Sequence, residues 1–483
     1  MTALVLLFLT AATPLPAQAP PEETGAAITP AEMRRHIEII ADDSMQGRDT
    51  PSPGLERAAR YVAAEFERLG LRPAGTDGGY EQRWGLSRWV PDTAASRIEL
   101  AGPGWRKEVR LGVDARYVGG SVDGRELRGE TVLLDDSAPD DPASEGEARD
   151  RVALLPVDYS GPLPSRLQER VDRLAAAARA VLILSNQDSP TFATRLRGAA
   201  QPRWSPDFRM HDDGAPVLEL HRRALDSGML GGGEQATVRL ERKYLSRATA
   251  PNLAGIVEGT DPALRGEYVA ITAHVDGVGI RPGARDSINN GADDNASGLA
   301  ALLEVAEAFS APGARPRRSL LFLVPSGEEK GLWGSAHFVA HPTVPLDRIV
   351  AVLNLDLIGR NWTDSVIVVG PEFSTLGETL RRVGEARPEL RMAPIRDRWP
   401  EERIFYRSDH YHFARRGVPI LFFTSGTHPD YHQPTDSPDR VDAEKASRVA
   451  RLLYHVARDV ADDPERPRWS PESYRRIVQE TRP

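Results

Sequence analysis

Apolar and polar positions follow two different patterns along the chain, and the pattern changes near residue 250. From Asn252 onward, near-continuous apolar runs alternate with stretches of helical spacing. Runs without polar interruptions are typical of parallel strands that are buried on both faces. The runs of this kind are YVAITAHV, SLLFLVPS, IVAVLNLDLI, VIVVG and VPILFFT. Helices are predicted at Ala296–Phe309, Ser374–Glu385 and Ala443–Val460. This alternation predicts a three-layer α/β sandwich with a mixed, mostly parallel sheet.

The chain before residue 250 predicts a pair of helices followed by a β-rich module. Ala31–Asp43 and Pro53–Leu69 have the spacing of helices, and Gly70 fits the end of the second one. Short β-like runs and Pro-, Asp- and Gly-rich loops follow, with one helix near Ser165–Ala178. These runs are Val152–Val157, Val181–Leu184 and Ala215–Leu220. We therefore expect a main domain over 247–463 completed by residues 28–88, a smaller β-rich insert over 89–246, and a loosely ordered, Arg- and Pro-rich tail over 464–483.

Composition and the N-terminal residues restrict the class of protein. The 483 residues exceed what one core usually holds, and 40% are hydrophobic, as in ordinary globular chains. A net charge of -9 argues against nucleic acid as a partner. The apolar run Ala3–Leu9, followed by Ala17-Gln18-Ala19, predicts a signal peptide over 1–19 and export to the bacterial periplasm or medium. An ordinary N-terminus is the alternative, because Lys and Arg are missing before the run, which is too short to span a bilayer stably.

Acidic and imidazole side chains follow the apolar runs of the second half. The chain has 0 cysteines, so a metal ion would have to be held by His, Asp and Glu. In α/β sheets, ligands bind beyond the carboxyl ends of the strands. The residues concerned are His274 and Asp276 in ITAHVDGVG, Asp293 and Asp294 in NNGADDNASG, Glu328 and Glu329 in SGEEKGLWGS, Asp356 in LNLDLIG, and His432 in DYHQPTD. Their placement predicts a site for zinc-like ions at this edge of the sheet.

Each of the earlier residues also has a simpler interpretation. His274 and Asp276 lie on one side of a strand end, where Asp276 would fix the histidine tautomer, although an HxD pair can also be a surface pair. Asp294 precedes a helix, where it can bridge two cations or cap the helix. Because adjacent residues seldom share a role, we assign the bridge to Asp294 and a cap or turn to Asp293.

The later residues also have a simple interpretation beside the functional one. Glu328 and Glu329 would be unremarkable on a surface helix, but after a buried strand one can bind metal while the other takes a proton from water. Asp356 lies within an apolar strand, where a carboxylate needs a partner to offset its desolvation, and a cation is the natural one. His432 alone could be a surface histidine, so its interpretation depends on the other residues.

Taken together and in this order, these motifs resemble a known family. HxD, GAxDNxSG, EE followed by GLxGS, NxDxIG and a late YH are similar to those of the co-catalytic di-zinc aminopeptidases. That family includes bacterial leucyl aminopeptidase and relatives of glutamate carboxypeptidase and glutaminyl cyclase. The resemblance covers about Asn252 to Val460 and extends weakly over Pro30–Tyr80. AAAARAVLILSN and a later PVLEL resemble a protease-associated (PA) domain inserted as a lid or substrate selector. One departure is Gly277, where many PA-containing relatives have His.

The resemblance implies a zinc exopeptidase fold with two Zn²⁺ ions per chain, although Co²⁺ or Mn²⁺ accept the same ligands. It places His274 and Asp356 on one ion, Glu329 and His432 on the other, and Asp294 between them. It makes Glu328 the general base and Asp276 the partner of His274. Tyr431 and Arg407 lie where the family has groups near the substrate carbonyl.

The implied activity is hydrolysis of the N-terminal peptide bond of a peptide by water that the two cations activate. A carboxypeptidase-like or cyclase-like enzyme on the same fold is the alternative within enzymes. A non-catalytic binding protein that presents its PA-like insert is the alternative outside them. The complete ligand set favours an enzyme, because a binding protein has no need of Asp356 within an apolar strand. The sequence leaves the preferred substrate residue and the oligomeric state open.

Overall fold

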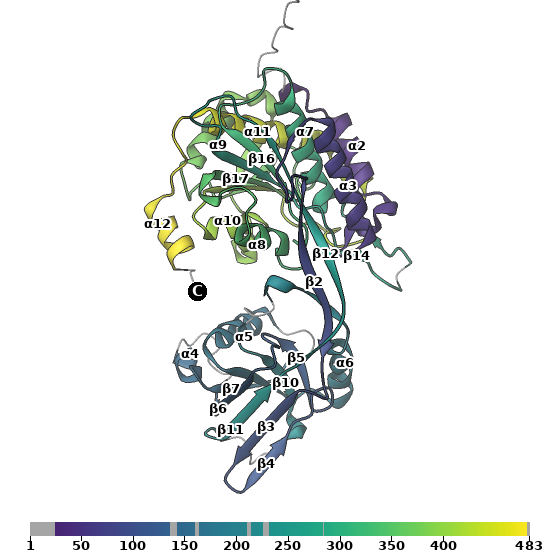
Figure 1. Cartoon of the computed structure of the whole chain (residues 1–483), viewed down its shortest axis with the longest axis vertical. Helices are drawn as coiled ribbons and strands as arrows, with labels where there is room; N and C mark the ends of the chain where they lie inside the picture. Colours follow the sequence, from purple (N-terminus) through teal and green to yellow (C-terminus); the bar gives the residue numbers. More distant parts are fainter. Residues whose placement is uncertain are drawn as a thin grey trace, which may run out of the picture. The chain divides into compact units, whose positions relative to one another are not determined.

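The computed structural model describes residues 25–135, 143–159, 164–209, 214–225, 231–283 and 285–480, and the predicted signal peptide at 1–19 lies outside them. The chain forms two compact units (Figure 1). Unit 1 contains the residues up to Trp84 and from Ala250 onward, and unit 2 contains Gly85–Thr249. The chain passes between the units within strands β2 (Glu81–Pro91) and β12 (Arg242–Val257).

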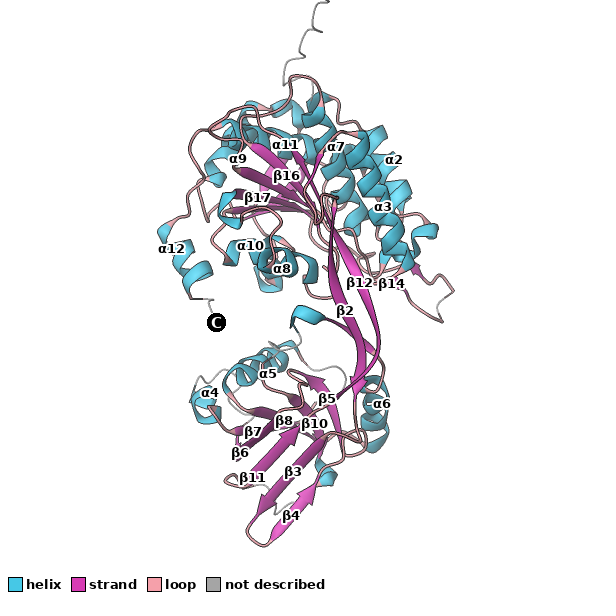
Figure 2. Ribbon diagram, viewed as in Figure 1, coloured by secondary structure: helices cyan, strands magenta, loops and turns pink. Residues whose placement is uncertain are grey.

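The sheet of unit 1 has its parallel strands at the centre (Figure 2). Its strand order is β19-β18-β20-β17-β13-β16-β12. The strands are β13 (Tyr268–Thr272), β16 (Ser319–Val324), β17 (Ile349–Leu355), β18 (Ser365–Val369), β19 (Ala393–Ile395) and β20 (Ile420–Thr424). The four strands β16, β13, β17 and β20 run parallel, whereas β12 and β18 pair antiparallel at either side. The short β1 (Arg72–Pro73) pairs with β12. Each predicted apolar run forms a strand, and the mixed, mostly parallel sheet is confirmed.

Helices cover both faces of this sheet and complete three layers (Figure 1). One layer contains the helices α2 (Pro30–Ile40), α3 (Pro53–Arg68), α7 (Gly298–Ser310), α9 (Leu376–Ala386) and α11 (Ala443–Asp462). In this layer α11 packs against α2, α7 and α9. The other layer contains α8 (Trp333–Ala340) and α10 (His410–Arg415), which contact each other. No helix among the described residues is long and apolar enough to cross a membrane.

Local sequence sets where the long helices begin. Pro53 is the first residue of α3, where its missing N–H breaks no helical hydrogen bond, and Ser52 Oγ accepts from the N–H of Leu55 at 3.1 Å. The Asp442 carboxylate caps α11 by accepting from the N–H of Lys445 at 3.0 Å. These caps place both helices close to their predicted bounds.

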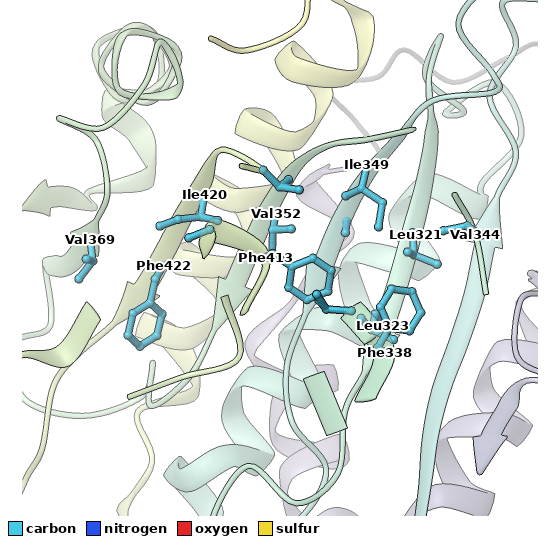
Figure 3. Packing of buried hydrophobic residues seen from close by; sticks show 14 of the residues in the cluster. Leu321, Leu323, Phe338, Val344, Ile349, Val352, Val369, Phe413, Ile420 and Phe422 are labelled. Carbon is cyan, nitrogen blue, oxygen red and sulfur yellow. The ribbon is translucent and has the colours of Figure 1, made fainter. Parts of the chain in front are cut away.

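An apolar core fills the space between the sheet and the layer of α8 and α10 (Figure 3). Leu321 and Leu323 of β16 face this side, because residues two apart on a strand share a face. They belong to one cluster with Phe338 of α8 and Phe413 of α10, whose ring centroids are 5.9 Å apart. This packing holds the parallel strands in register, so their carboxyl ends present side chains at fixed positions.

The C-terminal residues differ from the sequence prediction. A loosely ordered tail was expected over 464–483, but α12 (Pro471–Tyr474) and the helical turn Arg475–Gln479 pack on unit 1. Ile477 and Val478 join the core beside α10, and Trp469 Nε1 donates to the main-chain oxygen of Gly417 at 2.8 Å. The prediction was wrong because a few apolar residues, spaced to face one side, bury well within a charge-rich segment.

Removing the buried Ile477 side chain should therefore destabilise unit 1. We expect Ile477→Ala to lower the free energy of unfolding by about 2–5 kcal/mol, since the substitution leaves a cavity in a core. Chemical denaturation measures this change. The exposed Arg475→Ala, two residues away, should change stability by less than about 0.5 kcal/mol. Equal effects of the two substitutions would contradict the packed C-terminus.

Unit 2 has its own sheet and two apolar cores. The strand order is β4-β3-β11-β6-β7-β8-β10-β5, and β6, β7, β8 and β10 run parallel. The strands are β3 (Arg97–Gly102), β4 (Trp105–Glu108), β5 (Ala115–Gly119), β6 (Glu126–Leu133), β7 (Val152–Val157), β8 (Ala180–Ser185), β10 (Val217–His221) and β11 (Gln235–Arg239). Separately, β9 (Arg203–Pro206) pairs with β2. The helices are α4 (Ala143–Ala148), α5 (Ser165–Ala177) and α6 (Ser189–Ala199). The three predicted β-like runs and the predicted helix all form.

Candidate metal centre

The carboxyl ends of the parallel strands bring the predicted ligands together. His274 lies two residues after β13, Asp356 directly follows β17, and Glu328 and Glu329 lie in the turn after β16. His432 comes from the loop after β20. Asp294 belongs to the short helical turn Ala292–Ser297 that leads into α7. All of these side chains are buried or partly buried.

Two groups of side chains share Asp294. In the first, His274 Nε2 lies 3.4 Å from Asp294 Oδ1 and 3.4 Å from Asp356 Oδ1. In the second, His432 Nε2 lies 3.2 Å from Asp294 Oδ2 and 2.9 Å from Glu329 Oε2. Within each group one ligand atom from each residue lies within 4.8 Å of the others. Asp294 thus presents one oxygen to each group, as a carboxylate that bridges two cations would.

The unused polar atoms of these groups fit bound cations. Among the described residues, His274 Nε2, Asp356 Oδ1 and His432 Nε2 are buried and make no hydrogen bond. A buried polar atom without a partner costs about 1–3 kcal/mol, so such atoms seldom gather without a reason. Imidazole nitrogens and carboxylate oxygens are ligands that zinc accepts. The donor set and its geometry therefore fit two zinc-like ions.

The acids and histidines strongly influence one another's protonation. Burial would raise the pKa of Asp294, but contacts with His274 and His432 hold it below its usual range. Burial and the nearby Asp294 carboxylate raise the pKa of Glu329 to about 7, against the influence of His432. Burial alone would lower the pKa of His432, whereas Asp294 and Glu329 raise it to about 10. Several carboxylates thus crowd together, and cations would offset their mutual repulsion.

Glu328 stands apart from both groups of ligands. Its Oε2 lies 3.9 Å from His274 Nε2, and its main-chain N–H donates to Asp276 Oδ1 at 3.1 Å. Burial raises the pKa of Glu328 well above its usual range, and the Asp356 and Glu329 carboxylates act in the same direction. A carboxylate at this place, free of a ligand role, is suited to exchange protons with a reacting molecule.

Two aspartates beside the candidate ligands make contacts that the sequence did not reveal. Nδ1 of His274 lies 3.2 Å from the main-chain oxygen of Asp276, whereas the Asp276 carboxylate is 3.7 Å away and holds the Glu328 N–H instead. Asp293 was expected to cap a helix or form a turn, and it lies in the helical turn Ala292–Ser297 without capping a helix. Its Oδ1 accepts from the N–H of Gly359 at 2.6 Å, so this buried carboxylate ties the Asp294 turn to the chain after β17.

Tyr431 and Arg407 lie beside each other at the edge of the site. The Tyr431 ring stacks on His432, with centroids 3.8 Å apart. Arg407 Nη2 lies 3.4 Å from the Tyr431 hydroxyl, and Nη1 donates to Glu402 Oε2 at 3.2 Å. The structure therefore places Tyr431 against a candidate ligand and Arg407 against Tyr431.

Further residues hold the ligands in place, and the sequence analysis missed them. Ser408 Oγ donates to Asp356 Oδ2 at 2.8 Å and accepts from Asn354 Nδ2 at 2.8 Å. The Asp436 carboxylate accepts from the N–H groups of Asp293 at 3.0 Å and Asp294 at 3.1 Å. Both residues lie close in sequence to a residue already singled out, Arg407 for Ser408 and His432 for Asp436. Their nearness to those residues was the sequence signal. Their hydrogen-bond partners, Asp356 for Ser408 and Asp293 and Asp294 for Asp436, lie far away along the chain and become visible only in the fold.

Comparison with known proteins shows what this part of the chain is similar to. Residues 252–457, which include all the candidate ligands, match Peptidase family M28. The chain is 26% identical over 311 residues to the aminopeptidase YwaD of Bacillus subtilis (strain 168), covering 61% of this chain and 60% of that protein. It is 29% identical over 232 residues to the BOS complex subunit NCLN of Canis lupus familiaris, covering 43% of this chain and 40% of that protein. The chain thus spans less than two thirds of the length of these relatives.

Solved structures share the fold. An aminopeptidase from Aneurinibacillus sp. strain AM-1 aligns over 94% of this chain and 98% of its own, with a TM-score of 0.53. Its sequence identity is 19%, so this likeness concerns the fold alone.

Proposed function

We propose that this protein is a zinc-dependent aminopeptidase that hydrolyses the N-terminal peptide bond of peptides, because residues 252–457 match peptidase family M28. The observation that carries the proposal is the position of Asp294, with one oxygen toward each of two groups of candidate ligands. The aminopeptidase named among the relatives supports the choice of N-terminal bonds.

The residues that would hold two zinc ions are those of the two groups. His274, Asp294 and Asp356 form one, and Asp294, Glu329 and His432 form the other. When bound, two such cations polarise the scissile carbonyl and lower the pKa of a water molecule toward neutrality. The protein's part is to fix these side chains on the segments that follow the parallel strands.

Glu328 is the proposed general base. Its carboxylate would accept a proton from the attacking water and then deliver that proton to the nitrogen of the leaving amine. The hydrogen bond from its main-chain N–H to Asp276 holds this residue beside His274 without using its carboxylate. Asp276 therefore supports the base through the main chain.

In this proposal Tyr431, whose ring stacks on His432, donates a hydrogen bond to the substrate carbonyl oxygen as negative charge develops there. We expect Tyr431→Phe, which keeps the ring stacked on His432, to lower kcat about 100- to 1,000-fold with little change in KM. Steady-state kinetics measures both constants. A normal kcat would limit Tyr431 to packing against His432.

A panel of substrates tests the proposed activity. We expect release of nitroaniline from aminoacyl-nitroanilides with a free α-amine, and none from the same compounds with an acylated α-amine. C-terminal substrates that a carboxypeptidase would cleave serve as the comparison. Equal rates on free and blocked substrates would exclude an aminopeptidase.

Two further proposals concern parts of the chain away from the site. The apolar run before Ala17-Gln18-Ala19 supports export and cleavage of a signal peptide. Mass spectrometry of the protein from its natural host would detect the cleavage as loss of residues 1–19.

The AAAARAVLILSN motif supports a PA-like insert in unit 2. It contains the last residues of α5 and the whole of strand β8.

A further inference from the structure

A fully buried arginine lies behind the metal centre and outside the residues that match the peptidase family. Arg48 ends the helical segment Asp43–Arg48, and its exposed fraction is 0%. Its guanidinium donates four hydrogen bonds, all to main-chain oxygens: Nε to Val275 at 2.9 Å, Nη1 to Ile40 at 2.8 Å and Asn290 at 2.7 Å, and Nη2 to Gly291 at 3.0 Å. Among the described residues it forms no ion pair, although a buried charge is usually paired.

Three of the four accepting oxygens belong to the two segments that carry neighbouring ligands, and the fourth, that of Ile40, ends helix α2. Val275 directly follows His274. Asn290 and Gly291 directly precede the turn that carries Asp294. A planar guanidinium presents its donors in a fixed fork, so hydrogen bonds to both segments fix the distance between them. One side chain thereby ties together the segments of two ligands in the same group.

The main chain around Arg48 is fitted closely to the same segments. Gly47 has φ +64°, and a Cβ there would lie 2.5 Å from the oxygen of Asn289 and 2.7 Å from that of Gly279. A Cβ at Gly277 would lie 2.9 Å from the oxygen of Gly47. The Gly277 N–H also donates to the oxygen of Arg48 at 3.3 Å. Gly277 is the residue that departs from the pattern of the similar proteins. Because it has no side chain, the main chain at Gly47 can approach it closely.

We propose that Arg48 is a positioning residue that sets the separation of His274 and Asp294 and so the affinity for the cation between them. This inference rests on the proposed zinc-dependent function. Arg48 acts through main-chain oxygens and makes no hydrogen bond to a ligand side chain. Its charge by itself opposes a nearby cation, so removing the charge alone would strengthen zinc binding. If zinc binding weakens when Arg48 is removed, the loss must come from the changed positions of His274 and Asp294 and not from the lost charge.

The test measures zinc binding without substrate. The metal-stripped whole protein is titrated with Zn²⁺ against a chromogenic chelator, for the wild type, Arg48→Met and Arg48→Lys. We expect Arg48→Met to weaken the binding of at least one zinc ion about 10- to 100-fold, the range typical of residues that orient ligands. Arg48→Lys keeps the charge but replaces the fork with one ammonium, and we expect a loss in the same direction.

Arg318 provides the matched control. It is also fully buried and lies at the amino end of β16, where Nε donates to Glu267 Oε2 at 2.7 Å and Nη1 to the oxygen of Val460 at 3.1 Å. Arg318→Met should destabilise the fold but leave zinc affinity within about twofold of the wild type, because distant sites act independently. A loss of affinity equal to that of Arg48→Met would mean that general destabilisation, and not positioning, weakens zinc binding.

Two outcomes overturn the Arg48 proposal while the proposed function stands. One is unchanged or tighter zinc binding by Arg48→Met. If Arg48→Met does not fold, wild-type affinity in Arg48→Lys overturns it equally. A wild-type protein that binds no zinc would instead overturn the proposed function itself.

Discussion

Replacing Glu328 with glutamine is expected to lower kcat about 100- to 10,000-fold while bound zinc stays in place, because this range is typical of a general base. Glutamine has nearly the same shape, but its amide does not take a proton from water at neutral pH. Glu328 belongs to neither group of candidate ligands, so the metal sites keep their donors. Single-turnover hydrolysis and metal content, measured on one preparation, separate the two effects.

The matched control is Glu372→Gln, because Glu372 is exposed, follows strand β18 and belongs to neither group of candidate ligands. This variant should keep wild-type kcat and zinc content. A normal rate in Glu328→Gln would show that another group accepts the proton. Loss of zinc together with the rate would show that Glu328 is itself a ligand.

Replacing Asp294 with alanine is expected to have the largest effect on metal binding, because its two oxygens face different ligand groups. Both groups lose a ligand atom in this one variant. We expect the affinity for zinc to fall more than about 100-fold, beyond the range for residues that only orient ligands, and hydrolysis to fall with it. Titration of the metal-stripped protein measures the affinity of each ion.

Asp347→Ala is the control for this variant, because Asp347 is exposed just before β17, at the end opposite to Asp356. It should bind zinc as the wild type does. If Asp294→Ala lost one ion only and held the other with normal affinity, Asp294 would be a ligand of a single site and not a bridge.

The sheet and the candidate ligands were predictable because each leaves a local signal. Parallel strands that are buried on both faces have long apolar runs, and all five runs became strands of unit 1. Polar residues directly after such runs must lie at one edge of the sheet. His274, Glu329 and Asp356 were found in this way. Their division between two ions came from the family resemblance.

The features that the sequence did not reveal depend on contacts between distant segments. Arg48 would ordinarily be taken for a surface residue, since nothing nearby in the sequence shows that four main-chain oxygens surround it. Asp293 lies in a turn, which was one of its two predicted places, but its hydrogen bond from the N–H of Gly359 joins segments far apart along the chain. The C-terminal Ile477 is buried because a core lies beside it, whereas the surrounding composition indicated a loose tail.

Zinc content and its relation to activity test whether this protein is a two-zinc enzyme. The chain, purified without chelators, is analysed by plasma mass spectrometry, then stripped and titrated with Zn²⁺ while hydrolysis of an aminoacyl-nitroanilide is followed. A two-zinc site should give about two zinc ions per chain and activity that reaches its maximum only when both are bound. Fewer than about one zinc ion per chain after mild handling, or full activity in the stripped protein, would contradict it.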